Sequence, residues 1–306
     1  ETVAPLLEDG VRLIVADLPA ADLLALADLL AAAAAVILNA RSRQDRLRNA
    51  DCRGNVLHVM ASDAMLTDAL GQYLRRKRWT EIFLVVGRTP ADARYAEALR
   101  RAFKRYRLEV VVEKTWTFDP GNRRADSGVA IAQEEVAGFT QVGDYDVLVV
   151  ADAADHFGEY LPHRTVRPRP VAGTQGLVSS TWSRVHEQWG GTQLQGRFED
   201  QAGRFMTERD YANWLAVRAV GEAVTRTQSV DPATLKAFMR GPDFELQGFK
   251  GLALTFRPWN NQLRQRVLLA GPRMLVSVSP QPGFLHQRTE LDTLGYDKPE
   301  SACGLE

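Results

Sequence analysis

The chain has 306 residues, more than one hydrophobic core usually supports, and this length favours two lobes. With 45% hydrophobic residues the composition is that of a globular protein, and 38 basic residues balance 38 acidic ones, which argues against a nucleic-acid partner. The longest apolar stretch, residues 23–38, contains Asp28 and a run of alanines, so it predicts a buried helix and a strand, not a membrane span.

Apolar runs of strand length alternate with amphipathic helical segments through the first half of the chain, which predicts β-α units and parallel sheets. The expected strands are residues 11–16, 35–38, 82–86, 108–112 and 145–150. The expected helices are residues 20–30, 64–77 and 90–106, the second with Ser62 as its N-cap. Residues 119–128, rich in Gly, Asn, Arg and Asp, are expected to form an exposed loop.

The second half begins in the same way and then changes character. A short strand is predicted at residues 168–173, and Thr207 with Asp210 three positions later predicts the start of a helix over residues 207–226. From residue 248 onward, strands at residues 252–256, 266–270 and 274–278 are separated by Pro, Gly and Asn turns, which predicts a β-meander. The chain is therefore expected to cross more than once between the lobes. The predicted boundaries are residues 1–80 and 182–246 for lobe 1, and residues 81–181 and 247–306 for lobe 2.

Catalytic motifs are missing from the sequence. It contains no GxSxG, HExxH, GxxxxGK[ST] or helix-opening GxGxxG pattern, so the chain is not expected to be an enzyme. The alternative hypothesis is a hydrolase-like site at Asp152, His156 and Glu159, which follow the end of a predicted strand. The acidic residues of this region are separated by the length of that strand, so no single metal site is predicted.

Histidine and cysteine positions add little chemistry by themselves. His58 lies in a strand-like run, where a buried structural histidine is the expected role. Cys52 and Cys303 belong to no CxxC pair, which excludes a zinc cluster. The residues alone leave open whether these are two unrelated thiols or a disulfide that ties the C-terminal tail to the first lobe.

Aromatic and basic residues are dense between residues 179 and 197, where Trp182, Arg184, His186 and Trp189 occur. On a helix, Trp182 and His186 would share one face with Trp189. Such rings and guanidinium groups could hold a planar, anionic ligand. The alternative is that the tryptophans pack between the lobes and the arginines are solvated.

Several segments resemble one family, the ABC-transporter substrate-binding proteins associated with PQQ-dependent alcohol dehydrogenase systems. These segments are residues 11–17, 49–53, 157–162, 186–190, 257–260, 275–281 and 283–287. The family is a branch of the branched-chain amino acid binding superfamily. The resemblance implies a type I periplasmic binding protein fold, in which two Rossmann-like α/β/α lobes enclose a cleft. It also implies a periplasmic monomer that docks on an ABC permease in the inner membrane, and a disulfide between Cys52 and Cys303.

In the family that the sequence resembles, a further β-α-β segment precedes the helix that starts near Thr2. A parallel lobe without its first strands would expose a hydrophobic edge beside residues 11–15. We therefore expect the native polypeptide to carry such a segment ahead of Glu1.

The superfamily resemblance places the ligand at loops that follow the carboxyl ends of strands in both lobes. The predicted ligand-binding residues are Asp17, Asn39, Arg41, Asp152, Asp155 and Gln175, together with Trp182, Arg184, His186 and Trp189. Arg41 and Gln175 stand where amino acid receptors have small or acidic residues. The expected cargo is therefore a small organic anion or PQQ, with a lanthanide or calcium complex as the alternative. No resident cofactor is expected.

Overall fold

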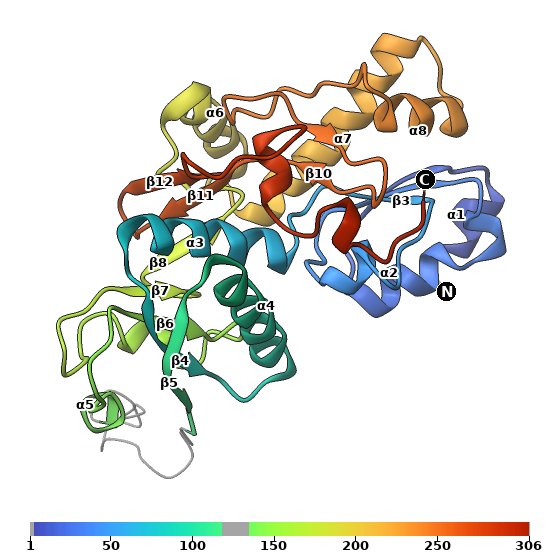
Figure 1. Cartoon of the computed structure of the whole chain (residues 1–306). Helices are drawn as coiled ribbons and strands as arrows, with labels where there is room; N and C mark the ends of the chain where they lie inside the picture. Colours follow the sequence, from blue (N-terminus) through green and yellow to red (C-terminus); the bar gives the residue numbers. More distant parts are fainter. Residues whose placement is uncertain (1–2, 118–134, 306) are drawn as a thin grey trace, which may run out of the picture. The chain divides into compact units, whose positions relative to one another are not determined.

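A computed structural model describes residues 3–117 and 135–305, and the chain divides into two compact units (Figure 1). Unit 1 consists of Glu1–Met65, Thr181–Val267 and Leu285–Glu306, and unit 2 of Leu66–Ser180 and Leu268–Phe284. This division differs from the predicted boundaries at residues 66–80, which belong to unit 2, and at residues 247–267 and 285–306, which belong to unit 1. The loop predicted at residues 119–128 lies outside the described residues.

Unit 1 is built on a three-stranded parallel sheet, in the order β1 (Leu13–Ala16), β2 (Val36–Asn39) and β3 (Val56–His58). All residues of β2 and β3 are buried, as expected for apolar strands in a parallel sheet. Helices α1 (Ala4–Glu8) and α2 (Ala20–Ala27) contribute Leu7 and Leu23 to one hydrophobic core. Short 3₁₀ helices η1 (Leu30–Ala32) and η2 (Asp45–Arg48) complete this part.

Three further helices of unit 1 are α6 (Gly191–Ala202), α7 (Glu208–Thr227) and α8 (Pro232–Arg240). Helix α7 begins as predicted, with a capping box between Thr207 and Asp210. Its buried residues Tyr211, Leu215 and Ala219 recur every fourth position, so one face of the helix enters the largest core together with residues of β2. The 3₁₀ helices η5 (Gln188–Gly190), η6 (Glu290–Thr293) and η7 (Lys298–Glu300) also belong to this unit.

Unit 2 contains a seven-stranded sheet in the order β12-β11-β8-β7-β6-β4-β5. The bounds are β4 (Glu81–Val86), β5 (Glu109–Thr115), β6 (Val147–Ala151), β7 (Val171–Gly173), β8 (Leu177–Ser180), β11 (Val267–Ala270) and β12 (Leu275–Ser279). Strands β4, β5, β6 and β7 pair in parallel, and β11 is antiparallel to β8. The remaining helices are α4 (Pro90–Tyr106), α5 (Glu135–Phe139), η4 (Gly158–Tyr160) and α3 (Asp63–Lys77), most of which lies in this unit.

The predicted C-terminal meander is wrong as a single sheet. Strand β9 (Thr255–Phe256) pairs with β10 (Leu263–Arg264) in unit 1, whereas β11 and β12 join the sheet of unit 2. Each residue of β11 is buried, which suits the interior of a larger sheet. The tail returns to unit 1 because the buried Arg257 donates to Asp292 and to the carbonyl groups of Leu291 and Leu294.

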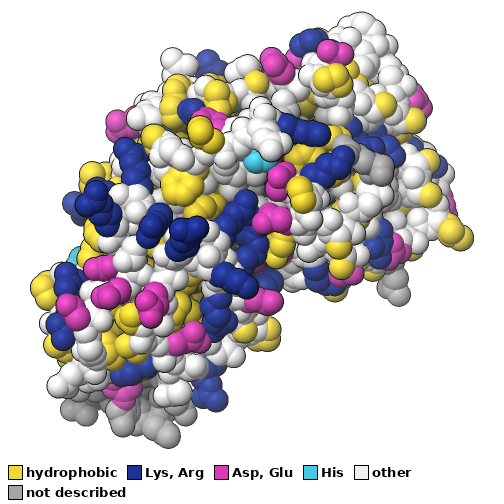
Figure 2. Space-filling model, in the orientation of Figure 1, with side chains coloured by type: hydrophobic (Ala, Val, Ile, Leu, Met, Phe, Trp, Pro, Cys, Tyr) yellow, Lys and Arg dark blue, Asp and Glu magenta, His cyan; other side chains and the backbone are white. Residues whose placement is uncertain are grey.

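A disulfide joins Cys52 to Cys303 within unit 1, with 5.7 Å between the two Cα atoms. This bond confirms the pairing that the family resemblance implies. On the molecular face drawn in Figure 2, basic and acidic side chains are interspersed, in keeping with the balanced charge. No helix within the described ranges has the length and apolar character needed to cross a membrane.

Candidate functional site

The carboxyl ends of β1 and β2 bring Asp17 and Arg41 together in unit 1. The two strands are parallel with Ala16 opposite Asn39, so the loops that follow them emerge at the same edge of the sheet. Arg41 Nε lies 3.9 Å from Asp17 Oδ1, beyond hydrogen-bond distance. Both oxygens of Asp17 instead accept from Arg209 of α7, at 2.7 Å each. The Arg41 side chain, 42% exposed, is therefore only loosely paired.

Asn39 is buried and shapes the loop that presents Arg41. Its Oδ1 accepts the backbone N–H groups of Arg41 and Ser42, at 3.2 and 2.8 Å. Its Nδ2 donates to the carbonyl of Ser42 and lies 3.1 Å from His58 Nδ1. His58 Nε2 donates to the carbonyl of Leu47. Burial, with the charge of Arg48, holds the pKa of His58 well below its usual value, so this histidine is neutral and structural, as predicted.

A second set of charges beside this loop was missed by the sequence analysis. Arg43 forms an ion pair with Glu208, the first residue of α7. Glu208 Oε1 also accepts from the backbone N–H and the hydroxyl of Thr181, at 2.7 and 2.9 Å. These partners lie up to 165 positions apart in the sequence, so no local sequence pattern predicts their contact.

In unit 2 the predicted residues at the strand ends separate into one buried acid, Asp152, and a hydrogen-bonded pair that is more accessible. Asp152 follows β6 and is 2% exposed. Its carboxylate accepts the backbone N–H groups of residues 156, 157 and 158 at 3.0, 2.8 and 2.7 Å. This use of both oxygens leaves Asp152 with a structural task, which weakens the hydrolase-like alternative with His156 and Glu159. Gln175 Nε2 donates to Asp155 Oδ1 at 2.6 Å, so the half-buried Gln175 and the exposed Asp155 do meet.

The aromatic segment of unit 1 is not the helix that its spacing allowed. Residues 182–187 are irregular, and Trp189 and Gly190 adopt left-handed backbone angles just before α6. Even so, the ring of His186 lies 5.4 Å from that of Trp182 and 5.8 Å from that of Trp189, measured between centroids. The rings of Trp182, His186 and Trp189 therefore come together because the chain turns between them, not because they share a helix face.

These aromatic residues differ in accessibility. Trp182 and His186 are buried, and Trp182 stacks on Tyr211 with 4.8 Å between centroids. Trp189 is 43% exposed, and the guanidinium of Arg266 lies 5.1 Å from its centroid. Arg184 lies over the ring of Phe205. Only Trp189 and Arg184 of this predicted group are thus reachable by a ligand without rearrangement of the core.

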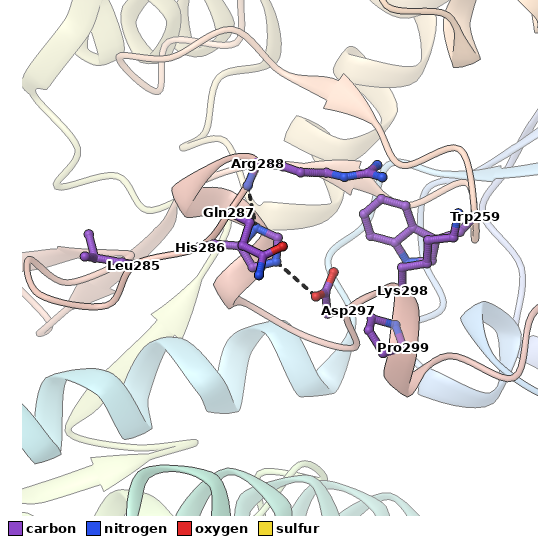
Figure 3. A pocket seen from close by; sticks show the side chains of 8 residues that line it. All are labelled: Trp259, Leu285, His286, Gln287, Arg288, Asp297, Lys298 and Pro299. Carbon is purple, nitrogen blue, oxygen red and sulfur yellow. Dashed lines mark hydrogen bonds and ion pairs between the residues drawn. The ribbon is translucent and has the colours of Figure 1, made fainter.

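Unit 1 also contains a cavity of about 930 Å³ near its C-terminal segments (Figure 3). The lining residues are Trp259, Leu285, His286, Gln287, Arg288, Asp297, Lys298 and Pro299. Figure 3 shows the Arg288 side chain extending toward the ring of Trp259. His286 Nδ1 accepts the backbone N–H of Arg288 at 3.2 Å, so Nε2 carries the hydrogen that Asp297 Oδ2 accepts at 3.0 Å.

The carboxylate of Asp297, which lines this cavity, interacts with neighbouring residues. Burial alone would raise the pKa of Asp297, but the hydrogen bonds from His286 and the backbone of Lys298, with the charges of His286 and Arg257, together lower it. Asp297 therefore carries a charge that His286 holds in place. Within residues 3–117 and 135–305, no three His, Cys, Asp or Glu side chains come together in a way that could hold a metal ion. The alternative of a lanthanide or calcium cargo gains no support from these residues.

Comparisons with known proteins place this geometry in context. A family model described as periplasmic binding protein matches residues 2–154. No curated protein matches. A branched-chain amino acid ABC transporter periplasmic ligand-binding protein from Burkholderia xenovorans LB400 is 15% identical with a TM-score of 0.73, covering 97% of this chain and 82% of that one.

Two other solved structures have similar folds. A solute-binding protein of an ABC transporter from R. palustris, in complex with benzoate, is 12% identical with a TM-score of 0.68, over 99% of this chain and 83% of that one. The leucine-, isoleucine-, valine-, threonine- and alanine-binding protein from Brucella ovis is 11% identical with a TM-score of 0.68, over 88% and 74% of the two chains. At such identities the likeness shows the fold alone.

Proposed function

The chain belongs to the periplasmic binding protein family, and from that premise we propose that it is the periplasmic solute-binding receptor of an ABC importer. In this proposal the receptor binds a small organic anion by closure of its lobes and delivers it to a permease in the inner membrane. The strand-end loops of each unit supply the ligand contacts, as ligand sites of open α/β sheets do. The solved structures of similar fold come from the same class of transport proteins.

The preference for an anionic ligand rests on the weak ion pairing of Arg41. Its partner Asp17 accepts two hydrogen bonds from Arg209, which leaves the Arg41 guanidinium 3.9 Å away and half exposed. A guanidinium with a weak internal partner is available for a carboxylate, which it can bind through two parallel hydrogen bonds. Asn39 holds the loop in the conformation that presents this side chain.

For the identity of the cargo we propose PQQ or a related organic anion of quinoprotein alcohol oxidation. The support for this finer step is the resemblance carried by residues 275–281 and 283–287, together with Arg41 and Gln175 at positions unsuited to a plain amino acid. Gln175 and Asp155 offer an amide and a carboxylate at the strand ends of unit 2, which suits a ligand with several polar groups.

The test is isothermal titration of the purified protein with PQQ and, separately, with leucine. We expect one-to-one binding of PQQ and none of leucine, and Arg41→Gln should weaken PQQ binding about tenfold or more because a charge-assisted hydrogen bond is lost. Arg226→Gln is the matched control, since Arg226 pairs with Glu222 on the same helix. Saturable binding of leucine without PQQ, or an Arg41→Gln variant as tight as the wild type, would contradict the proposal.

A further inference from the structure

A second cavity of unit 1, about 370 Å³ in volume, opens beside α6 and α7. Three aromatic side chains line it, from Phe198 on α6, Trp214 on α7 and Phe249 in the segment after α8. Two arginines, Arg197 and Arg218, share the lining, and no acidic side chain of the described residues does. The cavity therefore combines flat apolar surfaces with positive charge.

The aromatic surface of this cavity is supported from the core. Trp182 stacks on Tyr211, and Tyr211 in turn lies 6.0 Å from Trp214 at an interplanar angle of 20°. Trp214 then meets Phe249 with 5.8 Å between centroids. The stack runs from buried residues outward to the cavity, so the exposed rings have a fixed base.

The backbone around Phe249 is held in an uncommon conformation. Phe249 has φ of 55°, in the left-handed region that bulky residues rarely adopt. Tyr211 Oη donates to the carbonyl of Gly248 at 2.6 Å, and His186 Nε2 donates to the carbonyl of Phe249 at 2.8 Å. These bonds stabilise the segment that places the Phe249 ring in the cavity lining.

Ion pairing distinguishes the two arginines of the cavity from others nearby. Arg204 pairs with Asp210, Arg209 with Asp17 and Arg226 with Glu222. In the part of the chain that the structure describes, Arg197 and Arg218 form no ion pair with an acidic side chain; the guanidinium of Arg218 lies 5.7 Å from the Trp214 centroid. Among the described side chains, their charge is thus directed at the cavity without a counterion.

We propose that this cavity is a binding site for a small planar aromatic carboxylate. The ring of the ligand stacks against Trp214 and Phe249, and its carboxylate receives hydrogen bonds from Arg197 and Arg218. The volume lies within the range of small-molecule pockets. Its lining contains none of the strand-end residues Arg41, Asp155 and Gln175 on which the proposed receptor site depends.

Binding of naphthoate, followed by saturation-transfer NMR and titration calorimetry, tests the proposal. We expect saturable binding that Arg197→Gln and Arg218→Gln each weaken about tenfold. Naphthalenemethanol, which lacks the charge, and cyclohexanecarboxylate, which lacks the flat ring, should each bind at least about tenfold more weakly.

Two controls separate this site from others. Arg226→Gln removes a paired arginine of the same helix, and Arg41→Gln alters the proposed receptor site; both should bind naphthoate as the wild type does. Absence of saturable naphthoate binding, or binding that neither cavity variant weakens, would overturn the proposal. Loss of naphthoate binding in Arg41→Gln with full retention in both cavity variants would do the same, by placing the ligand elsewhere.

Discussion

Lys250 carries a buried amine whose hydrogen-bond partners are neutral carbonyl groups. Its Nζ donates to the carbonyl of Thr181 and, at 3.2 Å, to the carbonyl of Arg266, and it lies 5.1 Å from the centroid of Tyr211. Burial lowers the pKa of Lys250 to about 7, and the charge of Glu208 offsets this only in part. A neutral amine retains two N–H donors, which matches the two carbonyl acceptors.

The depressed pKa of Lys250 makes a prediction about stability and pH. Between pH 7 and about pH 10.5, the unfolded chain binds a proton at this lysine that the folded chain does not, so the free energy of unfolding rises with pH. One pKa unit is worth about 1.4 kcal/mol. We expect the wild type to gain about 3 kcal/mol over Lys250→Met between pH 7 and about pH 9.5, measured by urea unfolding. Lys236→Met, on α8, is the control; equal slopes for wild type and Lys250→Met would refute the assignment.

At the residue scale, the sequence predicted which side chains come together after the strands of unit 1. Asp17 and Arg41 were predicted and do lie together, because parallel strands place the loops that follow them at one edge. The hydrogen bonds from Arg209 to Asp17 could not be predicted, since the two residues lie 192 positions apart. Trp182 and His186 were predicted as ligand contacts on composition alone, and composition does not show that a ring is buried under its neighbours.

Helix α7 contributes to both proposed sites. It carries Arg209, which pairs with Asp17, and Tyr211, Trp214 and Arg218, which support or line the second cavity. Its start depends on Thr207, whose Oγ1 accepts from the backbone N–H of Asp210, and on Asp210, whose Oδ2 accepts from the backbone N–H of Thr207. The salt bridge from Arg204 and the bonds to Thr207 lower the pKa of Asp210, so this cap is charged at neutral pH.

Removal of the cap should destabilise the protein measurably. Thr207→Ala leaves the backbone N–H of Asp210 without its side-chain acceptor, so we expect a loss of about 1 kcal/mol in the free energy of unfolding. Val217→Ala on the same helix, 63% exposed, should change stability by less than about 0.5 kcal/mol. Denaturant unfolding of both variants measures the difference, and equal losses would show that the cap contributes nothing specific.

Elements with local signals were predicted well, and those with remote partners were not. Helix α4 spans Pro90–Tyr106 as predicted, since its N-cap, proline and apolar period all lie within the segment. The C-terminal strands were found but assigned to one meander, because the partner of β11 is β8, about 90 residues earlier. Strand pairing of that kind depends on the whole fold.

For the whole molecule, the type I periplasmic binding protein fold expected from the resemblance is confirmed by the family match and the solved structures of similar fold. The disulfide between Cys52 and Cys303 encloses a separation of 251 residues. Such a closed loop restricts the unfolded chain, which stabilises the folded one by about 2–5 kcal/mol.

The contribution of the disulfide can be measured directly. The double variant Cys52→Ser with Cys303→Ser should lose about 2–5 kcal/mol of unfolding free energy, and reductant should destabilise the wild type to a similar extent. Reductant should have no effect on the double variant, since the chain has only these two cysteines. An unfolding midpoint that reductant leaves unchanged would contradict the prediction.

Unit 1 is assembled from three stretches of chain, and the last of them includes residues beyond 300. During synthesis, every strand of the unit 2 sheet has been made once residue 279 has emerged, whereas Asp292 and Cys303 follow later. A nascent chain can therefore assemble unit 2 first, whereas the first two stretches of unit 1 cannot complete their fold until residues 285–306 have been made. Loss of the segment that carries Asp292 and Cys303 would accordingly damage a part of the protein that the ribosome made well before it.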